Sequence, residues 1–304
     1  YKCCNKFLEA HYMENTQKTY TIGEWLDTWL MDYASPMLRS STIQNYLYAR
    51  KRLDKHYPNI ENITLETLTP LDFQRMLNAL ASVYSKSSVA HIKVVYCEAY
   101  QEAVRNNICF CNPIREVQIP KHAARKKVSG MTIPEQDAFE SVLTQLSFMD
   151  HCMILTYLLT GLRRNELRNL RWKDWNSKQD YIQVCESKTT TGIRNIPIIP
   201  QVTSILHTLA QRKSCEYIFH VNGEKMTDGH IRYICTKVSR IAGIRHVTPH
   251  MLRHTFASRL FESDAGLKSL AEILGRTDPA FTLKTYVTVS QKHLAEQMRK
   301  LIRK

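Results

Sequence analysis

A break in helical periodicity divides this chain of 304 residues into two blocks. Between Asn112 and Gly130 the regular spacing of apolar residues stops, and two prolines and a basic run take its place. Proline and glycine interrupt regular structure, and a run of like charges stays in solvent. We therefore expect two domains, joined by a basic linker over residues 119–130.

The first block predicts a bundle of helices. Four apolar residues follow Thr21 at i, i+3, i+4 and i+7, namely Ile22, Trp25, Leu26 and Trp29. Further helices are expected over residues 41–57, from Pro70 onwards and over residues 87–106. Four amphipathic helices with short turns predict a small helical domain over residues 21–118. Residues 1–20 show no long periodic pattern and the chain begins with Tyr1, so we expect them to be the tail of a missing upstream segment.

The second block, residues 131–304, predicts helices around one β-hairpin. The segment Thr132-Ile133-Pro134-Glu135 is typical of a helix start. Between residues 181 and 199, β-branched residues flank a polar, basic tip at 187–192, which predicts a hairpin. Helices are expected over residues 134–146, 150–159, 163–170, 201–212, 228–242, 249–263 and 267–274. The expected fold class is mainly α with a small β-sheet.

Cysteine usage and hydropathy restrict the compartment. The nine cysteines form no CxxC pair, and an odd number so spaced fits neither a disulfide framework nor a zinc site. No window approaches 18 uncharged apolar residues, and no signal peptide is evident at the amino end. We expect an intracellular protein with reduced cysteines and no membrane association.

The positive charge lies almost entirely in the second part of the chain. Residues 1–118 carry 13 basic and 12 acidic side chains, whereas residues 119–304 carry 29 and 16. Such an excess predicts a polyanionic partner, most simply nucleic acid, although a solvated basic surface is the plainer alternative. The basic linker is expected either to follow a phosphate backbone or to act as a solvated hinge.

Missing motifs exclude several enzyme classes. The sequence contains no GxxxxGK[ST] and no GxGxxG, so no nucleotide cofactor is expected. It also contains no HExxH and no cluster of carboxylates typical of two-metal nucleases. If the chain cuts or joins nucleic acid, it must use cationic side chains and a side-chain nucleophile instead of a metal.

Three segments supply such groups. The first is Thr160-Gly161-Leu162-Arg163-Arg164-Asn165-Glu166, in which Glu166 is placed to brace Arg163 or to cap a helix. The second, His250-Met251-Leu252-Arg253-His254-Thr255-Phe256-Ala257, puts His250 and Arg253 at i and i+3 of one helix. The third runs from Leu274-Gly275-Arg276 to Tyr286.

In this order and spacing, the segments resemble the tyrosine recombinase, or phage integrase, family. The resemblance covers about residues 20–304 and implies a SAM-like helical core-binding domain followed by a mixed α/β catalytic domain. The matching positions are Arg163, Lys188 on the hairpin, His250, Arg253, Arg276 and Tyr286. Lys178 and Arg194 are alternatives to Lys188. The family usually has His or Trp where Arg276 stands, so we expect a phosphate contact there, of natural or engineered origin, rather than an acid–base group.

The resemblance also implies a mechanism. Tyr286 would attack the scissile phosphate and form a 3′-phosphotyrosyl link, while Arg163 and Arg253 bind the non-bridging oxygens. Lys188 would protonate the leaving 5′-oxygen, assisted by His250. His254 is expected to be structural. Neither metal nor ATP is needed, and strand exchange would pass through a Holliday junction.

The implied partners are duplex DNA at attachment sites, further copies of the chain in a tetramer, and accessory directionality or bending proteins, in the cytoplasm of a bacterial or phage-infected cell. A helix over residues 291–302 would pack on its own domain or on a neighbouring protomer. The expected function is an integrase of a phage or conjugative element, which an upstream arm-binding domain would favour. The alternatives are a host recombinase that resolves chromosome dimers, a DNA-binding relative without catalysis, and a type IB topoisomerase.

Overall fold

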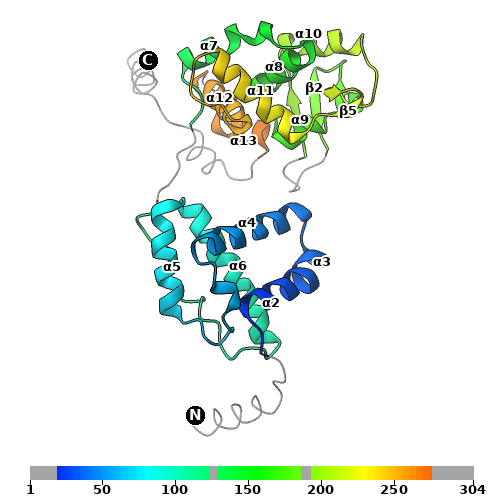
Figure 1. The fold of residues 1–304 in the computed structure, drawn as a ribbon. Helices are drawn as coiled ribbons and strands as arrows, with labels where there is room; N and C mark the ends of the chain where they lie inside the picture. The colour runs from blue at the N-terminus through cyan, green and yellow to red at the C-terminus, as the bar shows by residue number, and fades with distance from the viewer. Residues whose placement is uncertain (1–18, 124–128, 186–192, 264, 276–304) are drawn as a thin grey trace. The chain divides into compact units, whose positions relative to one another are not determined.

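The computed structural model describes residues 19–123, 129–185, 193–263 and 265–275. The chain forms two compact units, Tyr1–Lys127 and Val128–Lys304 (Figure 1). Each unit has its own hydrophobic core. No helix within these described ranges is long and apolar enough to cross a membrane.

The first unit begins with a capped helix. In α2 (Ile22–Thr28), the Thr21 hydroxyl accepts from the backbone N–H of Glu24, and the Glu24 carboxylate accepts from the backbone N–H of Thr21. The chain then continues through a π-helical turn, η1 (Trp29–Ala34), into α3 (Ser35–Met37). The helix expected after Thr21 is confirmed, whereas the apolar spacing gave no sign of the π-turn.

Three longer segments complete this helical unit. They are α4 (Ser40–His56), α5 (Pro70–Val83) and α6 (Lys86–Arg105), with a 3-10 turn, η2 (Ile60–Asn62), after α4. The hydroxyls of Thr69 and Ser85 cap α5 and α6. The expected helices over 41–57 and 87–106 are thus confirmed to within a residue or two at each end.

The core of the first unit is rich in aromatic side chains. The indole N–H of Trp25 donates to the carbonyl of Ala99 over 2.7 Å, and Trp29 stacks on Tyr46 with ring centroids 5.6 Å apart. A buried Trp whose indole N–H donates a hydrogen bond adds apolar surface to the core without leaving a buried donor unpaired. Ala123 is also buried in this core. The first part of the expected linker, residues 119–130, therefore packs against the first unit.

The second unit is mostly helical. Its α-helices are α7 (Ile133–Ser141), α8 (Phe148–Thr160), α9 (Arg164–Arg168), α10 (Pro200–Ala210), α11 (Asp228–Ile241), α12 (Pro249–Glu262) and α13 (Leu267–Leu274). Two short 3-10 turns, η3 (Leu143–Gln145) and η4 (Trp172–Asp174), lie between them. The continuous helix expected over 134–146 is wrong at its end, because after Val142 the backbone N–H groups bond three residues back. In α9 the helix is shorter than the expected 163–170.

Two small antiparallel sheets accompany these helices. The first has the order β1 (Trp175–Asn176), β2 (Tyr181–Val184) and β3 (Arg194–Pro197), with Ile182 opposite Ile196. The second is the pair β4 (His220–Val221) and β5 (Glu224–Lys225), which the sequence pattern did not predict. The expected hairpin is confirmed in its strands, while its tip at 187–192 lies outside the described residues.

The beginning of the second unit is fastened to α12. The backbone N–H of Met131 donates to the Thr255 hydroxyl over 2.8 Å, and the guanidinium of Arg259 donates to the carbonyl of Met131 over 2.9 Å. The guanidinium of Arg245 donates to the carbonyl of Gly130 over 2.6 Å. A Cβ at Gly130 would lie only 3.0 Å from the backbone of Thr255. Residues 130 and 131 are therefore held against the helix that carries His250 and Arg253.

Candidate active site

Two glycines end the helices α8 and α13 in the left-handed region. Gly161 has φ of +60° and Gly275 has φ of +61°, a conformation that glycine adopts at low cost. A Cβ on Gly161 would lie 2.2 Å from a ring carbon of Phe256, and one on Gly275 would lie 2.9 Å from Nη1 of Arg194. Both positions therefore require glycine, and the surrounding side chains fix the ends of both helices.

Arg253 lies buried between these two helix ends. The residue is 2% exposed. Its Nη1 donates to the carbonyl oxygen of Gly161 over 2.7 Å, and its Nη2 donates to that of Leu274 over 2.6 Å. Carbonyl groups at the carboxyl end of a helix carry partial negative charge and lack intrahelical partners. The two helix ends thus stabilise a buried cation and fix its orientation.

Arg163 reaches the same end of α13 from the start of α9. Its Nη2 donates to the carbonyl oxygen of Gly275 over 2.7 Å, and its Nη1 donates to Oε1 of Glu166 over 2.7 Å. The backbone N–H of Arg163 donates to Oε2 of Glu166, also over 2.7 Å. Glu166 therefore both braces the arginine and caps the helix. Because Leu274 and Gly275 are consecutive, Arg163 and Arg253 meet at one helix end, and the Arg163 side chain is 37% exposed.

Glu166 is held by a second arginine from the hairpin. Arg194 donates from Nη1 to Oε1 over 3.1 Å and from Nη2 to Oε2 over 2.9 Å, and its Nε donates to the carbonyl of Ile273 over 2.6 Å. The side chains of Glu166 and Arg194 are 5% and 7% exposed. Burial raises the pKa of Glu166, but the hydrogen bonds and charges of Arg194, and then Arg163, outweigh it and hold that pKa below its ordinary value.

His250 occupies the first turn of α12 and is exposed. Its ring meets that of His254 edge to face, with centroids 4.5 Å apart, and His254 is buried. The buried ring limits the orientations of the exposed one. His250 precedes Arg253 by three residues, so both belong to one turn of the helix.

Three of the expected site residues, Lys188, Arg276 and Tyr286, lie outside the described residues. The expected helix over 291–302 does so too. Of the alternatives to Lys188, Lys178 lies exposed in the turn between β1 and β2, at the other end of β2 from the hairpin tip. Arg194 is the buried partner of Glu166.

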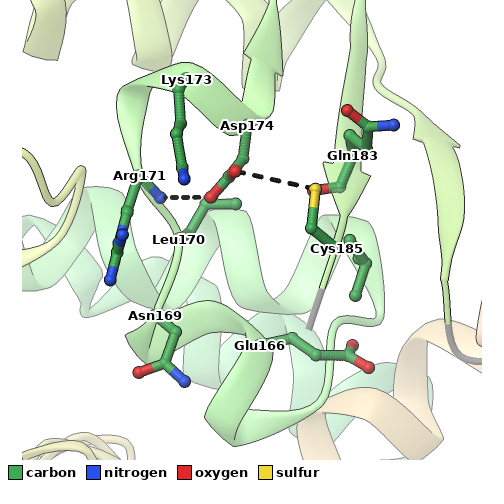
Figure 2. A pocket seen from close by; sticks show the side chains of 9 residues that line it. Glu166, Asn169, Leu170, Arg171, Lys173, Asp174, Gln183 and Cys185 are labelled. Carbon is green, nitrogen blue, oxygen red and sulfur yellow. Dashed lines mark hydrogen bonds between the residues drawn. The ribbon is translucent and has the colours of Figure 1, made fainter. Parts of the chain in front are cut away.

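A small pocket opens beside the end of β2 that leads to the hairpin tip (Figure 2). Within it, the backbone N–H of Arg171 donates to Asp174 over 2.9 Å, and the thiol of Cys185 lies 3.9 Å from the same carboxylate. Glu166 contributes to the wall, but Figure 2 shows its carboxylate pointing away from Asp174. The nine residues that line the pocket are Glu166, Asn169, Leu170, Arg171, Lys173, Asp174, Gln183, Val184 and Cys185.

Comparison with known proteins identifies the family of this chain. Residues 135–293 match the sequence model of the phage integrase family, and residues 21–81 match that of the phage integrase N-terminal SAM-like domain. The first match covers more than half of the chain. The chain therefore belongs to the phage integrase family.

Two relatives are tyrosine recombinases. One, from Agathobacter rectalis, is 25% identical over 290 residues, which span 83% of this chain and 92% of the relative. The other, tyrosine recombinase XerA from Pyrococcus furiosus, is 32% identical over 189 residues, which span 60% of this chain and 64% of the relative. The resemblance to the tyrosine recombinases, and the recombinase class of enzyme that it implied, are confirmed.

Solved structures of integrases share the fold. A Tn1549 transposon integrase fragment in complex with a circular intermediate DNA has a TM-score of 0.75 at 19% identity, covering 93% of this chain and all of that one. A lambda integrase tetramer bound to a Holliday junction has a TM-score of 0.76 at 20% identity, covering 91% of this chain and 80% of that one. The expected fold class, mainly α with a small β-sheet and with a SAM-like helical domain before a mixed α/β catalytic domain, is confirmed.

Proposed function

We propose that this chain is a site-specific DNA recombinase of the integrase type, which cleaves and rejoins DNA through a 3′-phosphotyrosyl intermediate. The observation that carries the proposal is the convergence of Arg163 and Arg253 at the end of α13, directly before Arg276. The next Tyr in the sequence, Tyr286, follows Arg276 by ten residues. We assign residues 21–118 to core binding and residues 131–304 to catalysis, joined by the linker 119–130.

The two arginines suit a phosphate under attack. A guanidinium stays charged at any working pH and donates two parallel hydrogen bonds to phosphate oxygens. The carbonyl contacts of Arg253 leave it rigid before DNA arrives, and preorganised donors stabilise developing charge without reorganisation. Arg163, with its side chain more exposed, is the partner that DNA reaches first.

The reaction then follows from groups of this chain. The Tyr286 hydroxyl gives up its proton, to His250 acting as base or to solvent, and its oxygen forms a bond to phosphorus while the bond from phosphorus to the 5′-oxygen breaks. Lys188 gives that oxygen its proton, and His250 assists as acid, base or phosphate ligand. The reverse attack by a 5′-hydroxyl of another strand releases Tyr286. The number of phosphodiester bonds is unchanged, so ATP is not needed, and Arg276 serves as a phosphate contact.

Two related proteins support the assembly that we propose. The Tn1549 integrase fragment is described in complex with DNA and lambda integrase as a tetramer on a Holliday junction. We propose that this chain likewise assembles as four protomers on two attachment sites in the cytoplasm. The Pyrococcus relative is named XerA, which keeps a host recombinase that resolves chromosome dimers as the second candidate.

Covalent capture tests the chemistry. The wild type and Tyr286→Phe would be incubated in EDTA with a pool of nicked suicide duplexes whose cores are randomised, and adducts would be separated on a denaturing gel. We expect an adduct from the wild type alone. The sequences captured would then serve as defined substrates, and a wild type that binds DNA without forming an adduct would contradict the proposal. Relaxation of supercoiled plasmids without paired sites would instead identify a topoisomerase.

A further inference from the structure

Arg194 connects three parts of the second unit. It is the first residue of β3 and pairs with Val184, so it stands at the end of the sheet beside the connection to the hairpin tip. Its guanidinium binds both oxygens of Glu166 on α9, and its Nε binds the carbonyl of Ile273 in α13. Gly275 packs directly over it. One side chain therefore links the hairpin, the helix that follows Arg163 and the helix end on which both site arginines rest.

We propose that Arg194 is a positioning residue for strand transfer, which binds Glu166 so that Arg163 keeps its net positive charge for the DNA phosphate. This inference rests on the proposed function. It assigns Arg194 no contact with DNA.

Counting charges in this cluster explains the proposal. Arg163, Glu166 and Arg194 together carry two positive charges and one negative charge, so the cluster presents a net charge of +1. Without Arg194, a buried carboxylate would face Arg163 and cancel its charge, because opposite charges in a poorly solvated site interact strongly. Arg163 would also be drawn onto both carboxylate oxygens. The fork of Arg194 therefore shares both oxygens of Glu166 with Arg163.

Other charged groups near Glu166 do not replace Arg194. The phenol of Tyr157 on α8 is buried, and burial raises its pKa far above the working range, so it stays neutral. Arg164 follows Arg163 and pairs with Asp228 over 2.7 Å. The remaining titratable groups that share the pocket wall with Glu166 are Arg171, Lys173, Asp174 and Cys185 (Figure 2).

The test compares adduct formation at saturating DNA in wild type, Arg194→Gln, Arg194→Lys and the double variant Arg194→Gln with Glu166→Gln. The neutral variant is expected to react about tenfold or more slowly at pH near 8, with DNA affinity within about threefold. The rate deficit should narrow as the pH falls, because without Arg194 the burial of Glu166 favours its protonated form, and a protonated carboxyl no longer cancels the charge of Arg163. Glu166→Gln in the same background should recover about threefold or more of the rate.

Two further variants separate charge from structure. Arg194→Lys keeps the charge and loses the fork, so it should react about threefold to tenfold more slowly with a wild-type pH profile; it also serves if the neutral variant fails to fold. Arg168→Met is the control, because Arg168 is a partly buried arginine of α9 that, like Arg194, binds one carboxylate and one backbone carbonyl, those of Asp228 and Met226. Arg168→Met should not lower the rate of adduct formation in a pH-dependent way.

The outcomes distinguish the inference from the proposed function. A wild type that forms no adduct would overturn both. A wild type that forms the adduct while Arg194→Gln matches it would overturn the inference alone. The inference would also be overturned if Arg194→Gln slowed adduct formation equally at every pH and Glu166→Gln did not restore the rate. That pattern is expected of a residue with a purely structural role.

Discussion

The guanidinium of Arg163 donates a hydrogen bond of 2.7 Å to the carbonyl oxygen of Gly275, 112 residues away in the chain. Gly275 is the last residue before Arg276 and the segment that contains Tyr286. A proposed phosphate ligand is thus bonded directly to the backbone from which the proposed nucleophile's segment departs. Its own helix brace, Glu166, lies only three residues on.

The left-handed cap at Gly161 is expected to be intolerant of any side chain. Gly161→Ala would place a Cβ at 2.2 Å from the Phe256 ring at a φ of +60°, so we expect a loss of about 2 kcal/mol or more in the free energy of unfolding. Urea denaturation would measure it. Adding Phe256→Leu should recover part of the loss, and an additive or larger loss in the double variant would contradict the steric explanation.

Glu166→Gln should make stability less dependent on pH. The folded-state pKa of Glu166 is lowered, so its carboxylate contributes stability that is fully present above the unfolded value of about 4.3 and is lost as the pH falls through the folded value. At neutral pH we expect the variant to lose about 3 kcal/mol, since it leaves two arginines poorly paired. Thermal unfolding between pH 7 and pH 3 should show the two proteins converge, and parallel curves would exclude the ion pair as the cause.

Replacement of the two site arginines, Arg163 and Arg253, should have different effects on the stability of the fold. Arg163→Met removes a partly exposed side chain, so it should reduce the rate of adduct formation about 100-fold, as expected for about 3 kcal/mol of transition-state stabilisation, with a small change in melting temperature. Arg253→Met should reduce the rate similarly and also destabilise the fold, because it leaves the buried carbonyls of Gly161 and Leu274 without this donor. Equal melting temperatures for the two variants would argue against that distinction.

DNA binding should weaken steeply with salt. The second part of the chain, residues 119–304, carries 29 basic and 16 acidic side chains. If this excess makes about six or more phosphate contacts, affinity should fall about 10³-fold between about 50 and 200 mM salt. Filter binding or anisotropy at several salt concentrations would give the slope. A slope near zero would show that the basic surface serves solubility instead.

Local sequence patterns predicted the helices well because helix starts are local events. The Thr21 and Thr132 capping boxes, and the Thr248-Pro249 start of α12, each involve residues within one turn. The β4–β5 pair escaped notice because its strands have only two residues each. Such strands leave no alternating pattern.

The sequence pattern predicts much less of the ion pairs and burial in the candidate site than of the helices. Spacing alone indicates that Glu166 can brace Arg163. Arg194, which also holds Glu166, stands 28 residues away, and the sequence pattern offers it only as an alternative to Lys188. Similarly, spacing places His250 and Arg253 on one turn of a helix, but it does not indicate that Arg253, His254 and Thr255 are all buried. Tertiary packing decided both cases, because helix-end carbonyls supply partners that no periodicity records.

The attachment of Gly130 and Met131 to α12 gives tension in the chain a defined path. Thr255, Arg259 and Arg245 bind the backbone of these two residues, which follow the segment that connects the units. A pull transmitted along that segment would be borne first by Arg245, which binds Gly130 just before α12 begins, and then by the helix that holds Arg253. Because Arg245 also pairs with Glu135 of α7, such a load would be shared between α7 and the helix of a proposed phosphate ligand.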